Sequence, residues 1–321
     1  MSLLLRHVHW RAAGREGYAD IRISRGRIRT IGPGLVPARD EQVLELEGYV
    51  ALPGLINAHD HLGLNLFPRS GHPPYSNFYA WAGDIYRPRD EMQTEIMSVS
   101  LRDRLHWGAY RNLISGVTTV AHHDPYVRRI FNRRFPVHVL RFGWAHSLGF
   151  DPHIRSRALA ARLRRRMFVV HAAEGTDAGA AGEIELLREM RLLRSNTILI
   201  HAVALESRHI ELIVEGRCSV VWCPTSNEYL YEASPPISEL RRRGVPVALG
   251  TDSTLSGSAT LLDEIRFVRK HGEIDDEELF GMVTTDAARI FRLRDGRGTL
   301  REGGLADIAV FSRGSCWAED P

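Results

Sequence analysis

The chain has 321 residues, 44% of them apolar and 25% charged, which suits a globular enzyme with one large domain or two ordinary ones. The formal net charge is only +3, and we interpret the densest basic run, Arg162–Arg166, as a solvated helix face, because a nucleic-acid surface needs a broader basic area with interleaved aromatic residues. Three scattered cysteines, no apolar run of the roughly 18 to 20 residues that span a bilayer and no signal-peptide pattern argue against a disulfide framework and a membrane protein. We therefore expect a cytoplasmic protein with a small-molecule substrate and no nucleic-acid or membrane partner.

The first 50 residues predict a small β-subdomain, because short alternating segments such as LLLRHVHW are separated by turn residues. The chain closes with GRGTLREGGLADIAVFS, which predicts a turn and a strand that rejoins this subdomain. The expected domains are therefore a β-sandwich subdomain over residues 1–50, completed by about 298–315, and a main domain over residues 51–297.

The main domain is predicted to alternate strands with helices. It begins with an apolar strand that ends in His59-Asp60-His61, and the Pro- and aromatic-rich loop Phe67–Arg89 that follows is long enough to be a lid or a substrate wall. The other predicted elements are helix Glu91–Leu113, strand Gly116–Asp124, strand Phe135–Ser147, helix Ile154–Arg166, strand Phe168–Gly175, helix Asp177–Leu193 with Asp177 as its N-cap, strand Thr197–Val203, helix Ser207–Glu215, strand Ser219–Ser226, helix Ile237–Arg243, strand Pro246–Ser253 and helix Leu261–His271.

This alternation predicts an α/β fold with a parallel sheet that is covered on both faces. Polar residues follow nearly every strand rather than one switch point, and no G-x-G-x-x-G turn follows any strand, so a (β/α)₈ barrel is favoured over a doubly wound sheet. Seven strands are counted where a closed barrel needs eight. We therefore expect a barrel that is distorted or one strand short.

The strand ends carry residues that bind metals. His59 and His61 are two positions apart, so both imidazoles project from one edge of a strand, where they form half of a tetrahedral metal site or are simply solvated. Three later apolar strands end in His171, His201 and Asp252. A barrel would bring these ends together, and a metal that activates water needs such protein ligands and one open position.

Glu174 lies three residues after His171, beyond the strand end, where alternation no longer sets its direction. It can reach over the water as a proton shuttle, while His201 can polarise the substrate or hold developing charge. Each residue also has a simpler interpretation, with Asp252 as a helix N-cap, His201 in the core and Glu174 as a loop carboxylate. Their joint occurrence at successive strand ends favours a catalytic site.

Several motifs carry a family resemblance between Pro53 and Phe311. In chain order they are PGLINAHDH, GVTTV, HAAEG, LIHAVAL, CPTSN, GVPVALGTDS and TTDAARIFRL. In these motifs the chain resembles the amidohydrolase superfamily, in particular its cytosine, guanine and adenosyl-type deaminases and its triazine hydrolases. It departs from the family in the short stretch between GVTTV and HAAEG and in the loop after HDHLGLN. Because both regions normally contact substrate, the resemblance predicts the reaction class better than the substrate.

The resemblance implies one divalent metal ion, zinc in the first place and iron or manganese otherwise. The ligands that it implies are His59, His61, His171 and Asp252. It also implies that Glu174 and His201 serve in proton transfer and substrate activation, and that Asp252 orients or deprotonates the attacking water. No lysine ends a middle strand, and Lys270 lies in the last barrel helix, so a site with a single metal ion is expected. The other zinc-deaminase signature, H-x-E with P-C-x-x-C, is absent from the sequence.

Further residues near strand ends are candidates for substrate contacts. They are His122, His146, Arg141 and Trp81, and His123 occupies a similar place. The alternatives are that the histidines are surface or supporting groups, that Arg141 forms a structural ion pair and that Trp81 serves in packing.

These observations predict a metal-dependent hydrolase of C–N bonds outside peptides, and most specifically a hydrolytic deaminase of an amino-substituted nitrogen heterocycle. The alternatives are an amidase or cyclic-amide hydrolase of the same superfamily, and a non-catalytic relative that binds a metabolite. The resemblance also makes a homo-oligomer an expectation.

Overall fold

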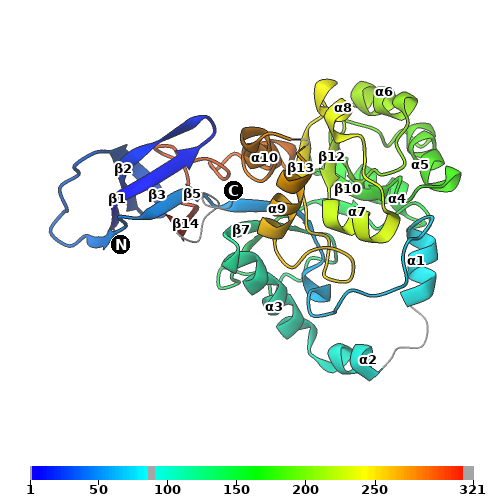
Figure 1. The fold of residues 1–321 in the computed structure, drawn as a ribbon, viewed down its shortest axis with the longest axis horizontal. Coiled ribbons are helices and arrows are strands. Elements are labelled where there is room, and N and C mark those ends of the chain that lie inside the picture. The colour runs from blue at the N-terminus through cyan, green and yellow to red at the C-terminus, as the bar shows by residue number, and fades with distance from the viewer. Residues whose placement is uncertain (1, 86–90, 273, 314–321) are drawn as a thin grey trace.

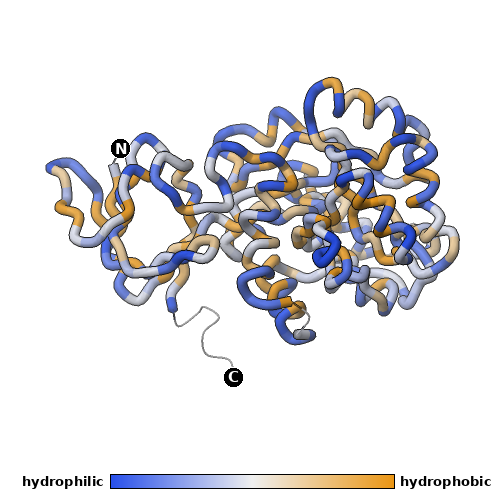
Figure 2. The backbone as a smooth tube through the Cα atoms, turned by 90° about the horizontal axis from the view of Figure 1, so that it is seen from above, coloured by the Kyte–Doolittle hydropathy of each residue, from blue (hydrophilic) through white to orange (hydrophobic). Residues whose placement is uncertain are grey.

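The computed structural model describes residues 2–85, 91–272 and 274–313, which form two lobes (Figure 1). The smaller lobe is a β-sheet built by the start of the chain and by its last described strand. The larger lobe contains the helices and the parallel strands, and its apolar stretches lie mainly inside (Figure 2). No helix in the described ranges is long and apolar enough to cross a membrane.

The smaller lobe is a six-stranded sheet with the order β14-β5-β1-β2-β3, in which β4 also pairs with β1. Its strands are β1 (Ser2–Ala12), β2 (Arg15–Ser24), β3 (Arg27–Gly32), β4 (Gln42–Glu45), β5 (Tyr49–Pro53) and β14 (Ile308–Ser312). Its core includes Val8, Ile21 and Ile28, which are fully buried. Gly54 joins this lobe to the barrel, and a side chain there would collide with Thr118 and Asp307.

The larger lobe is a barrel of short parallel strands. They are β6 (Leu55–Asp60), β7 (Val117–His122), β8 (His138–Val139), β9 (Gly143–Ala145), β10 (Phe168–Ala172), β11 (Thr197–His201), β12 (Ser219–Trp222) and β13 (Val247–Leu249). They form the ladders β6-β7-β8 and β9-β10-β11-β12-β13. The ring closes because the His61 amide donates to the Asp252 carbonyl oxygen (3.0 Å) and the Thr251 amide donates to the His59 carbonyl oxygen (3.0 Å).

Strands β8 and β9 share one position in this ring. Only Leu140, Arg141 and Phe142 separate them, with β8 paired to β7 on one side and β9 paired to β10 on the other. The single strand predicted over Phe135–Ser147 is therefore divided, and the ring has seven positions instead of eight. The expectation of a distorted, shortened barrel is confirmed.

The helices cover the outside of the barrel or follow its strands. They are η1 (Leu62–Leu64), α1 (Phe78–Ile85), α2 (Glu91–Ser98), α3 (Leu101–Ile114), α4 (Ile154–Leu163), α5 (Ala178–Glu189), α6 (Ser207–Gly216), α7 (Pro224–Tyr231), α8 (Ile237–Arg242), α9 (Leu261–His271), α10 (Asp276–Met282) and α11 (Thr285–Ile290). The single helix predicted over Glu91–Leu113 is wrong. The first helix ends at Ser98, and Ser100 caps the second, because its hydroxyl accepts a hydrogen bond from the Asp103 amide.

Both faces of the barrel wall are buried, as the near-continuous apolar strands predict. Val170, Leu199 and Val220 face the helices in one cluster, whereas Val169 and Ile198 face the barrel interior in another. Because successive side chains alternate between these layers, the face of each residue at a strand end is set by its register.

Candidate metal centre and active site

Histidines and one aspartate converge at the carboxyl end of the barrel. His59 is the penultimate residue of β6, His171 lies in β10, and Asp252 follows β13. The Nε2 atoms of His59 and His171 are 3.2 Å apart, and Asp252 Oδ1 lies 3.5 Å from His59 Nε2. His61 Nε2 lies 3.7 Å from the same Asp252 oxygen. The structure thus brings together all four residues that were predicted as ligands, and each is buried.

The spacing of these donor atoms fits one small cation. A tetrahedral zinc site with bonds of about 2.0–2.1 Å has edges of roughly 3.3–3.4 Å between its ligand atoms, close to the separations observed here. The ligand atoms of His59, His171 and His201 also lie within 4.8 Å of one another. His201 is therefore at the edge of the same site.

The hydrogen bonds of the rings direct their Nε2 lone pairs into the site. His171 Nδ1 donates to the His146 carbonyl oxygen (2.7 Å), so its Nε2 carries no proton when the ring is neutral. His123 Nε2 donates to the Ala145 carbonyl oxygen (3.0 Å), and His123 Nδ1 is 3.3 Å from His59 Nδ1. His123 therefore accepts the His59 Nδ1 proton, which leaves the Nε2 of His59 as a second lone pair facing that of His171. Two lone pairs at this distance repel each other unless a cation lies between them.

The third imidazole is oriented by a carboxylate. Asp124 Oδ2 lies 3.0 Å from His61 Nδ1, an arrangement that fixes the ring and strengthens its other nitrogen as a ligand. Asp252 is oriented in turn by Ser226 and Ser256, whose hydroxyls donate to its Oδ2 at 2.8 and 2.6 Å. These bonds leave Asp252 Oδ1 facing the imidazoles.

The electrostatics of the site also favour a cation. Burial lowers the pKa of His59 to about 3, and burial with the neighbouring histidines lowers that of His171 well below its usual range. Burial would also lower the pKa of His61, but the carboxylates of Asp124 and Asp252 outweigh it and raise the value to about 9. Burial opposes ionisation of Asp252, yet close contact with His59 and the nearby imidazoles holds its pKa far below the usual range. The cluster thus stabilises positive charge beside two neutral imidazoles.

Glu174 and His201 lie beside the donor set. Glu174 Oε1 is 3.6 Å from His201 Nε2 and accepts a hydrogen bond from the Tyr231 hydroxyl at 2.9 Å. Burial raises the pKa of Glu174, which favours its protonated form. Among the described residues, Glu174 Oε2 has no hydrogen-bond partner although it is buried, which indicates a group awaiting a ligand. His201 Nδ1 is 2.8 Å from Asn227 Oδ1, to which it donates.

The backbone is strained at the strand ends that carry this chemistry. His201 and Asp252 have φ values of 67° and 60°, and Ala173 and Ala202 are also left-handed, at 52° and 54°. Such conformations cost L-residues free energy and persist where the surroundings impose them, often at functional sites. The left-handed residues turn the chain sharply at the end of each of these strands, so that the side chains of the site lie over the carboxyl end of the barrel.

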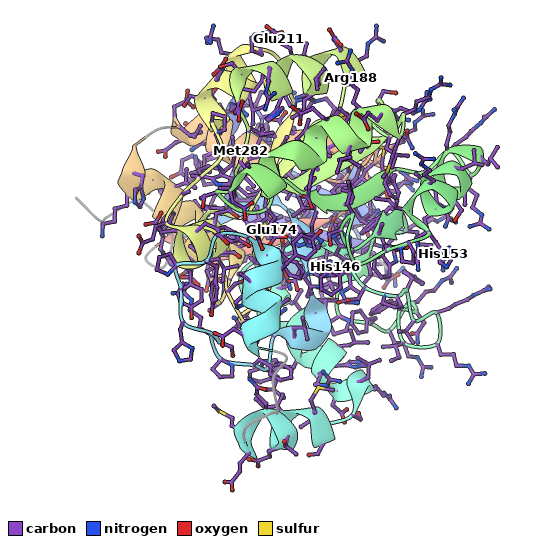
Figure 3. The ribbon with its side chains drawn as sticks, turned by 90° about the vertical axis from the view of Figure 1, so that its right-hand side faces the viewer. His146, His153, Glu174, Arg188, Glu211 and Met282 are labelled. Atoms are coloured by element: carbon purple, nitrogen blue, oxygen red, sulfur yellow. The ribbon has the colours of Figure 1, made fainter. Side chains whose placement is uncertain are left out.

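The long loop after β6 covers the site, as predicted. The Phe78 amide donates to the Glu174 carbonyl oxygen (3.0 Å), so helix α1 begins against the loop of the buried acid. The Phe78 ring lies 4.8 Å from the ring of His146. His146 and Glu174 are both found near one end of α1 (Figure 3). Residues 86–90, the last part of the predicted loop, are outside the described residues.

Only one of the four predicted substrate contacts lies at the site. The ring of His146 is half-buried and 4.8 Å from that of His171. β7 directs His123 rather than His122 into the barrel, and His122 Nδ1 accepts a hydrogen bond from the Leu62 amide. The guanidinium of Arg141 lies 4.5 Å from the centre of the Tyr126 ring instead of at the site.

Arg141 lines a pocket at the other end of the barrel, together with residues that precede β10. Trp81 is buried in the packing of the loop, where its Nε1 donates to the Ser70 carbonyl oxygen (3.0 Å), so it offers no open face for stacking. Trp81 is thus found in packing, which was its alternative interpretation, whereas among the described residues Arg141 does not form the structural ion pair that was its alternative.

Several supporting residues were not identified from the sequence. Asp124, Asn227, Tyr231, Ser226 and Ser256 each make a hydrogen bond to a site residue. The cluster His-His-Asp at the end of β7 was a visible signal for Asp124. Ser226 and Asn227 belong to the CPTSN motif at the start of α7, whereas no pattern distinguishes Tyr231 of α7 and Ser256 of the loop after β13.

Comparisons with known proteins agree with this geometry. A model of the amidohydrolase family matches residues 157–316. The chain is 27% identical over 340 residues to a 5-methylthioadenosine/S-adenosylhomocysteine deaminase of Halobacterium salinarum, an alignment that covers 91% of this chain and 76% of the relative. It is 22% identical over 351 residues to a 5'-deoxyadenosine deaminase of Methanothrix thermoacetophila, with 93% and 82% covered.

Solved structures show the same fold. A triazine hydrolase from Arthobacter aurescens matches with a TM-score of 0.77 at 18% identity, covering 99% of this chain and 89% of that one. An adenosine deaminase from Xanthomonas campestris with bound zinc matches with a TM-score of 0.78 at 17% identity, covering 98% and 85%. Fold and site together define a metal-dependent barrel hydrolase. Residues 157–316 match the amidohydrolase family, and most of the chain is similar to deaminases.

Proposed function

We propose that this chain is a hydrolytic deaminase of an amino-substituted nitrogen heterocycle, with adenine nucleosides as the first substrate class to test. The names of the relatives support this class, since they are deaminases of 5-methylthioadenosine, S-adenosylhomocysteine and 5'-deoxyadenosine. The observation that carries the proposal is the buried Glu174, whose pKa is raised by burial and whose Oε1 lies 3.6 Å from His201 Nε2 at the edge of the donor set.

The proposed ligands of a single divalent metal ion are His59, His61, His171 and Asp252. Zinc suits three imidazoles and one carboxylate, and a zinc-bound relative of the same fold supports this choice. When bound, such an ion lowers the pKa of a water molecule, so that a nucleophile is present near neutral pH.

Glu174 is proposed to act as the general acid. Its protonated carboxyl would donate to the ring nitrogen next to the amino-bearing carbon while the water oxygen bonds to that carbon. Asp252 would accept the proton that the water loses, since its Oδ1 faces the site and its Oδ2 is held by two serine hydroxyls. The amino group would then take up this proton, the C–N bond would break, and ammonia would leave as the remaining hydroxyl proton returns to Glu174 and the ring carbon becomes a carbonyl.

His201 and His146 are proposed to position the substrate. Because Asn227 holds His201 Nδ1, the His201 ring faces the reacting centre with a fixed Nε2. His146 and Phe78 present a ring pair beside His171 that a flat heterocycle can contact.

Ammonia release tests the proposal. Metal-reconstituted protein should release ammonia from adenine nucleosides, and Glu174→Gln should lower kcat/KM by about 10²–10⁴-fold, the usual contribution of a positioned acid. Glu264→Gln is the matched control, since Glu264 is also fully buried with a pKa raised to about 7 but bonds to Thr225 and Ser258 instead. Hydrolysis of cyclic amides without ammonia release would favour the amidase, and tight binding without turnover would favour the metabolite-binding relative.

A further inference from the structure

A wide basic groove lies at the amino end of the barrel, opposite the candidate metal centre. Two pockets of about 700 and 800 Å³ form it, and they share Arg165, Arg166 and Arg292. Its walls come from the end of α4, the loop before β11, the end of α6, the segment after α11 and the stretch that contains β8. We call these two pockets the arginine groove.

The arginine groove concentrates positive charge. Ten arginines line it, but Glu215 is its one carboxylate among the described residues. The groove thus carries a formal charge of +9, whereas the whole chain carries +3, so the remainder of the molecule is net negative at −6. Within the described ranges, no arginine of the groove forms an ion pair with a carboxylate, and Arg165, Arg166 and Arg217 are exposed.

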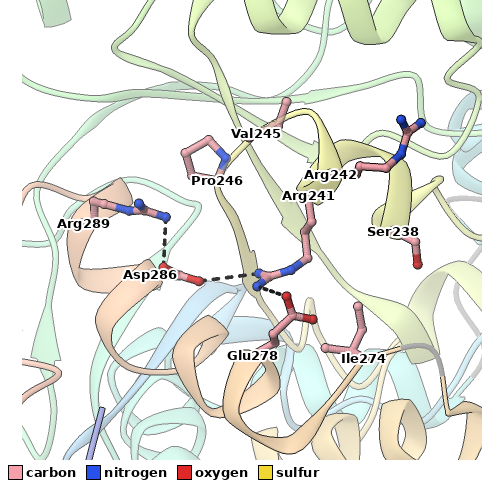
Figure 4. A pocket seen from close by; sticks show the side chains of 10 residues that line it. Ser238, Arg241, Arg242, Val245, Pro246, Ile274, Glu278, Asp286 and Arg289 are labelled. Carbon is pink, nitrogen blue, oxygen red and sulfur yellow. Dashed lines mark hydrogen bonds and ion pairs between the residues drawn. The ribbon is translucent and has the colours of Figure 1, made fainter. Parts of the chain in front are cut away.

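A neighbouring pocket shows the usual arrangement of arginines in this protein. That pocket, of about 480 Å³, lies beside α8, α10 and α11 (Figure 4). There Arg241 pairs with Glu278 at 2.9 Å and with Asp286 at 3.5 Å, and Asp286 also pairs with Arg289 at 2.9 Å. In this pocket, carboxylates of neighbouring helices neutralise the arginines. The arginine groove has no carboxylate paired with its arginines among the described residues.

The groove also holds arginines where the backbone favours glycine. Arg165, Arg217 and Arg292 follow the last turns of α4, α6 and α11 in the left-handed conformation, with φ values of 53°, 53° and 55°. Glycine is the favoured residue there, because it has no Cβ to crowd the following carbonyl. Three other helices of the same protein follow this rule: α3, α8 and α9 are followed by Gly116, Gly244 and Gly272 at φ values of 80°, 76° and 70°.

Helix dipoles account for part of this charge. A cation near a helix C-terminus is favourable, and α4, α6 and α11 all end at the groove. However, α3 and α8 are followed by glycine at the equivalent left-handed position. The helix dipole therefore does not require an arginine there. The remaining seven arginines of the groove lie outside the three left-handed positions, where their mutual repulsion is uncompensated within the described chain.

Aromatic rings lie among the arginines of the larger part of the groove. Tyr126 and Phe142 are partly exposed there, and Arg141 stacks over the Tyr126 ring. Interleaved rings and guanidinium groups are the combination that binds single-stranded nucleic acids, since bases stack on the rings while arginines contact phosphates. The sequence shows only the run at Arg162–Arg166, because the groove is assembled from distant segments.

We propose that the arginine groove binds a single-stranded nucleic acid. Phosphates would contact arginines along both pockets, and bases would stack at the Tyr126 end. A recessed groove accepts a flexible strand, whereas a flat anionic membrane would reach only its rim. This proposal replaces the expectation that the chain has no nucleic-acid partner, and it is independent of the proposed deaminase activity at the opposite end of the barrel.

Fluorescence anisotropy with a labelled 20-nucleotide single strand tests the proposal, using the full chain over a range of salt concentrations. The triple variant Arg165→Gly, Arg217→Gly, Arg292→Gly should bind at least about tenfold more weakly in 50 mM salt, and its slope of log K against log salt should fall by about 2, since each lost phosphate contact removes roughly 0.7. Glycine adopts the left-handed conformation freely, so this variant should fold at least as well as the wild type, which thermal unfolding checks.

Arg25→Gly is the matched control. Arg25 also has a left-handed backbone, at φ 53°, but it lies in the turn between β2 and β3 of the smaller lobe. Its replacement should leave affinity and salt slope unchanged. Tyr126→Leu should weaken binding several-fold at a constant salt slope, because it removes stacking and no charge.

Three results would overturn the proposal. One is the absence of salt-dependent binding of the single strand at 50 mM salt. Another is a triple variant that binds like Arg25→Gly. The third is equal or tighter binding of inorganic polyphosphate, of a duplex of the same length or of anionic vesicles, since each would show that the groove selects charge alone or a different partner.

Discussion

The two ends of the barrel place charge in opposite ways. At the carboxyl end, imidazoles and carboxylates are buried, and each has a hydrogen-bond partner that fixes its orientation, as Asp124 does for His61. In the arginine groove at the amino end, the arginines are exposed and have no carboxylate partners among the described residues. Left-handed residues occur at both ends, such as Asp252 at one and Arg217 at the other. Buried charge needs internal partners because water is excluded, whereas exposed charge can remain unpaired until a ligand brings counter-charge.

Removing the metal ligands should give the largest effect, and it tests whether the carboxyl end is a metal centre. A His171→Ala, Asp252→Ala double variant should lose about one equivalent of bound metal per chain and at least about 10³-fold in kcat, because activation of water by a metal contributes several kcal/mol. Elemental analysis and ammonia release measure the two losses. His153→Ala, which changes an exposed histidine away from the cluster, should keep both. Wild-type protein that stays metal-free after reconstitution would contradict the hydrolase mechanism.

The pH dependence of stability should arise at the carboxyl end, because arginines do not titrate in the accessible range. Glu183 accepts hydrogen bonds from the Ala173 amide (2.9 Å) and the Tyr79 hydroxyl (3.0 Å), and burial raises its pKa from 4.5 to about 7. Between these values the folded chain holds the proton and the unfolded chain does not. The free energy of unfolding should therefore fall as pH rises from 4.5 to 7, by about 3 kcal/mol at most.

Urea denaturation of wild type and Glu183→Gln across this window measures that contribution. The variant cannot titrate at this position. The difference in the free energy of unfolding between wild type and variant should therefore shrink or reverse as pH rises. If the free energy of unfolding changed with pH by the same amount in both proteins, Glu183 would ionise normally in the folded state.

Breaking the hydrogen bond from His59 to His123 should weaken metal binding without removing a ligand. His123→Leu should lower zinc affinity by about 10–100-fold, the usual effect of losing a group that orients a metal ligand. Competition with a chromophoric chelator at fixed pH measures the affinity. His123→Gln keeps a donor and an acceptor and should recover part of the loss. Equal affinities for His123→Leu and wild type would mean that the His59 ring is fixed by packing alone.

The smallest expected effect concerns the free energy that is lost when arginine occupies a left-handed backbone position at the amino end. Gly244→Arg, at the end of α8, should lower the free energy of unfolding by about 1 kcal/mol, because it places a side chain on a left-handed backbone. Arg217→Gly should raise it by up to about 1 kcal/mol, less whatever the helix dipole contributes. Chemical denaturation measures both changes. A destabilised Arg217→Gly variant would show that the dipole outweighs the backbone strain.

The sequence by itself determined much of the carboxyl end. Strand alternation placed His59 and His61 on one edge, and the recurrence of polar residues at strand ends indicated that His171, His201 and Asp252 would meet. Such patterns are local, since two-residue alternation and strand direction fix which face and which end a side chain occupies. The shortened barrel was also visible as a count of seven strands.

Only the tertiary structure decided what depends on register and on distant segments. It selected His123 over His122 for the interior, because the pairing of β7 with β6 and β8 sets which of two adjacent residues faces inward. It placed Arg141 at the amino end, since β8 and β9 share one ring position. It assembled the arginine groove from segments between Tyr126 and Arg294. Long-range packing created these features, and no local pattern in the chain encodes them.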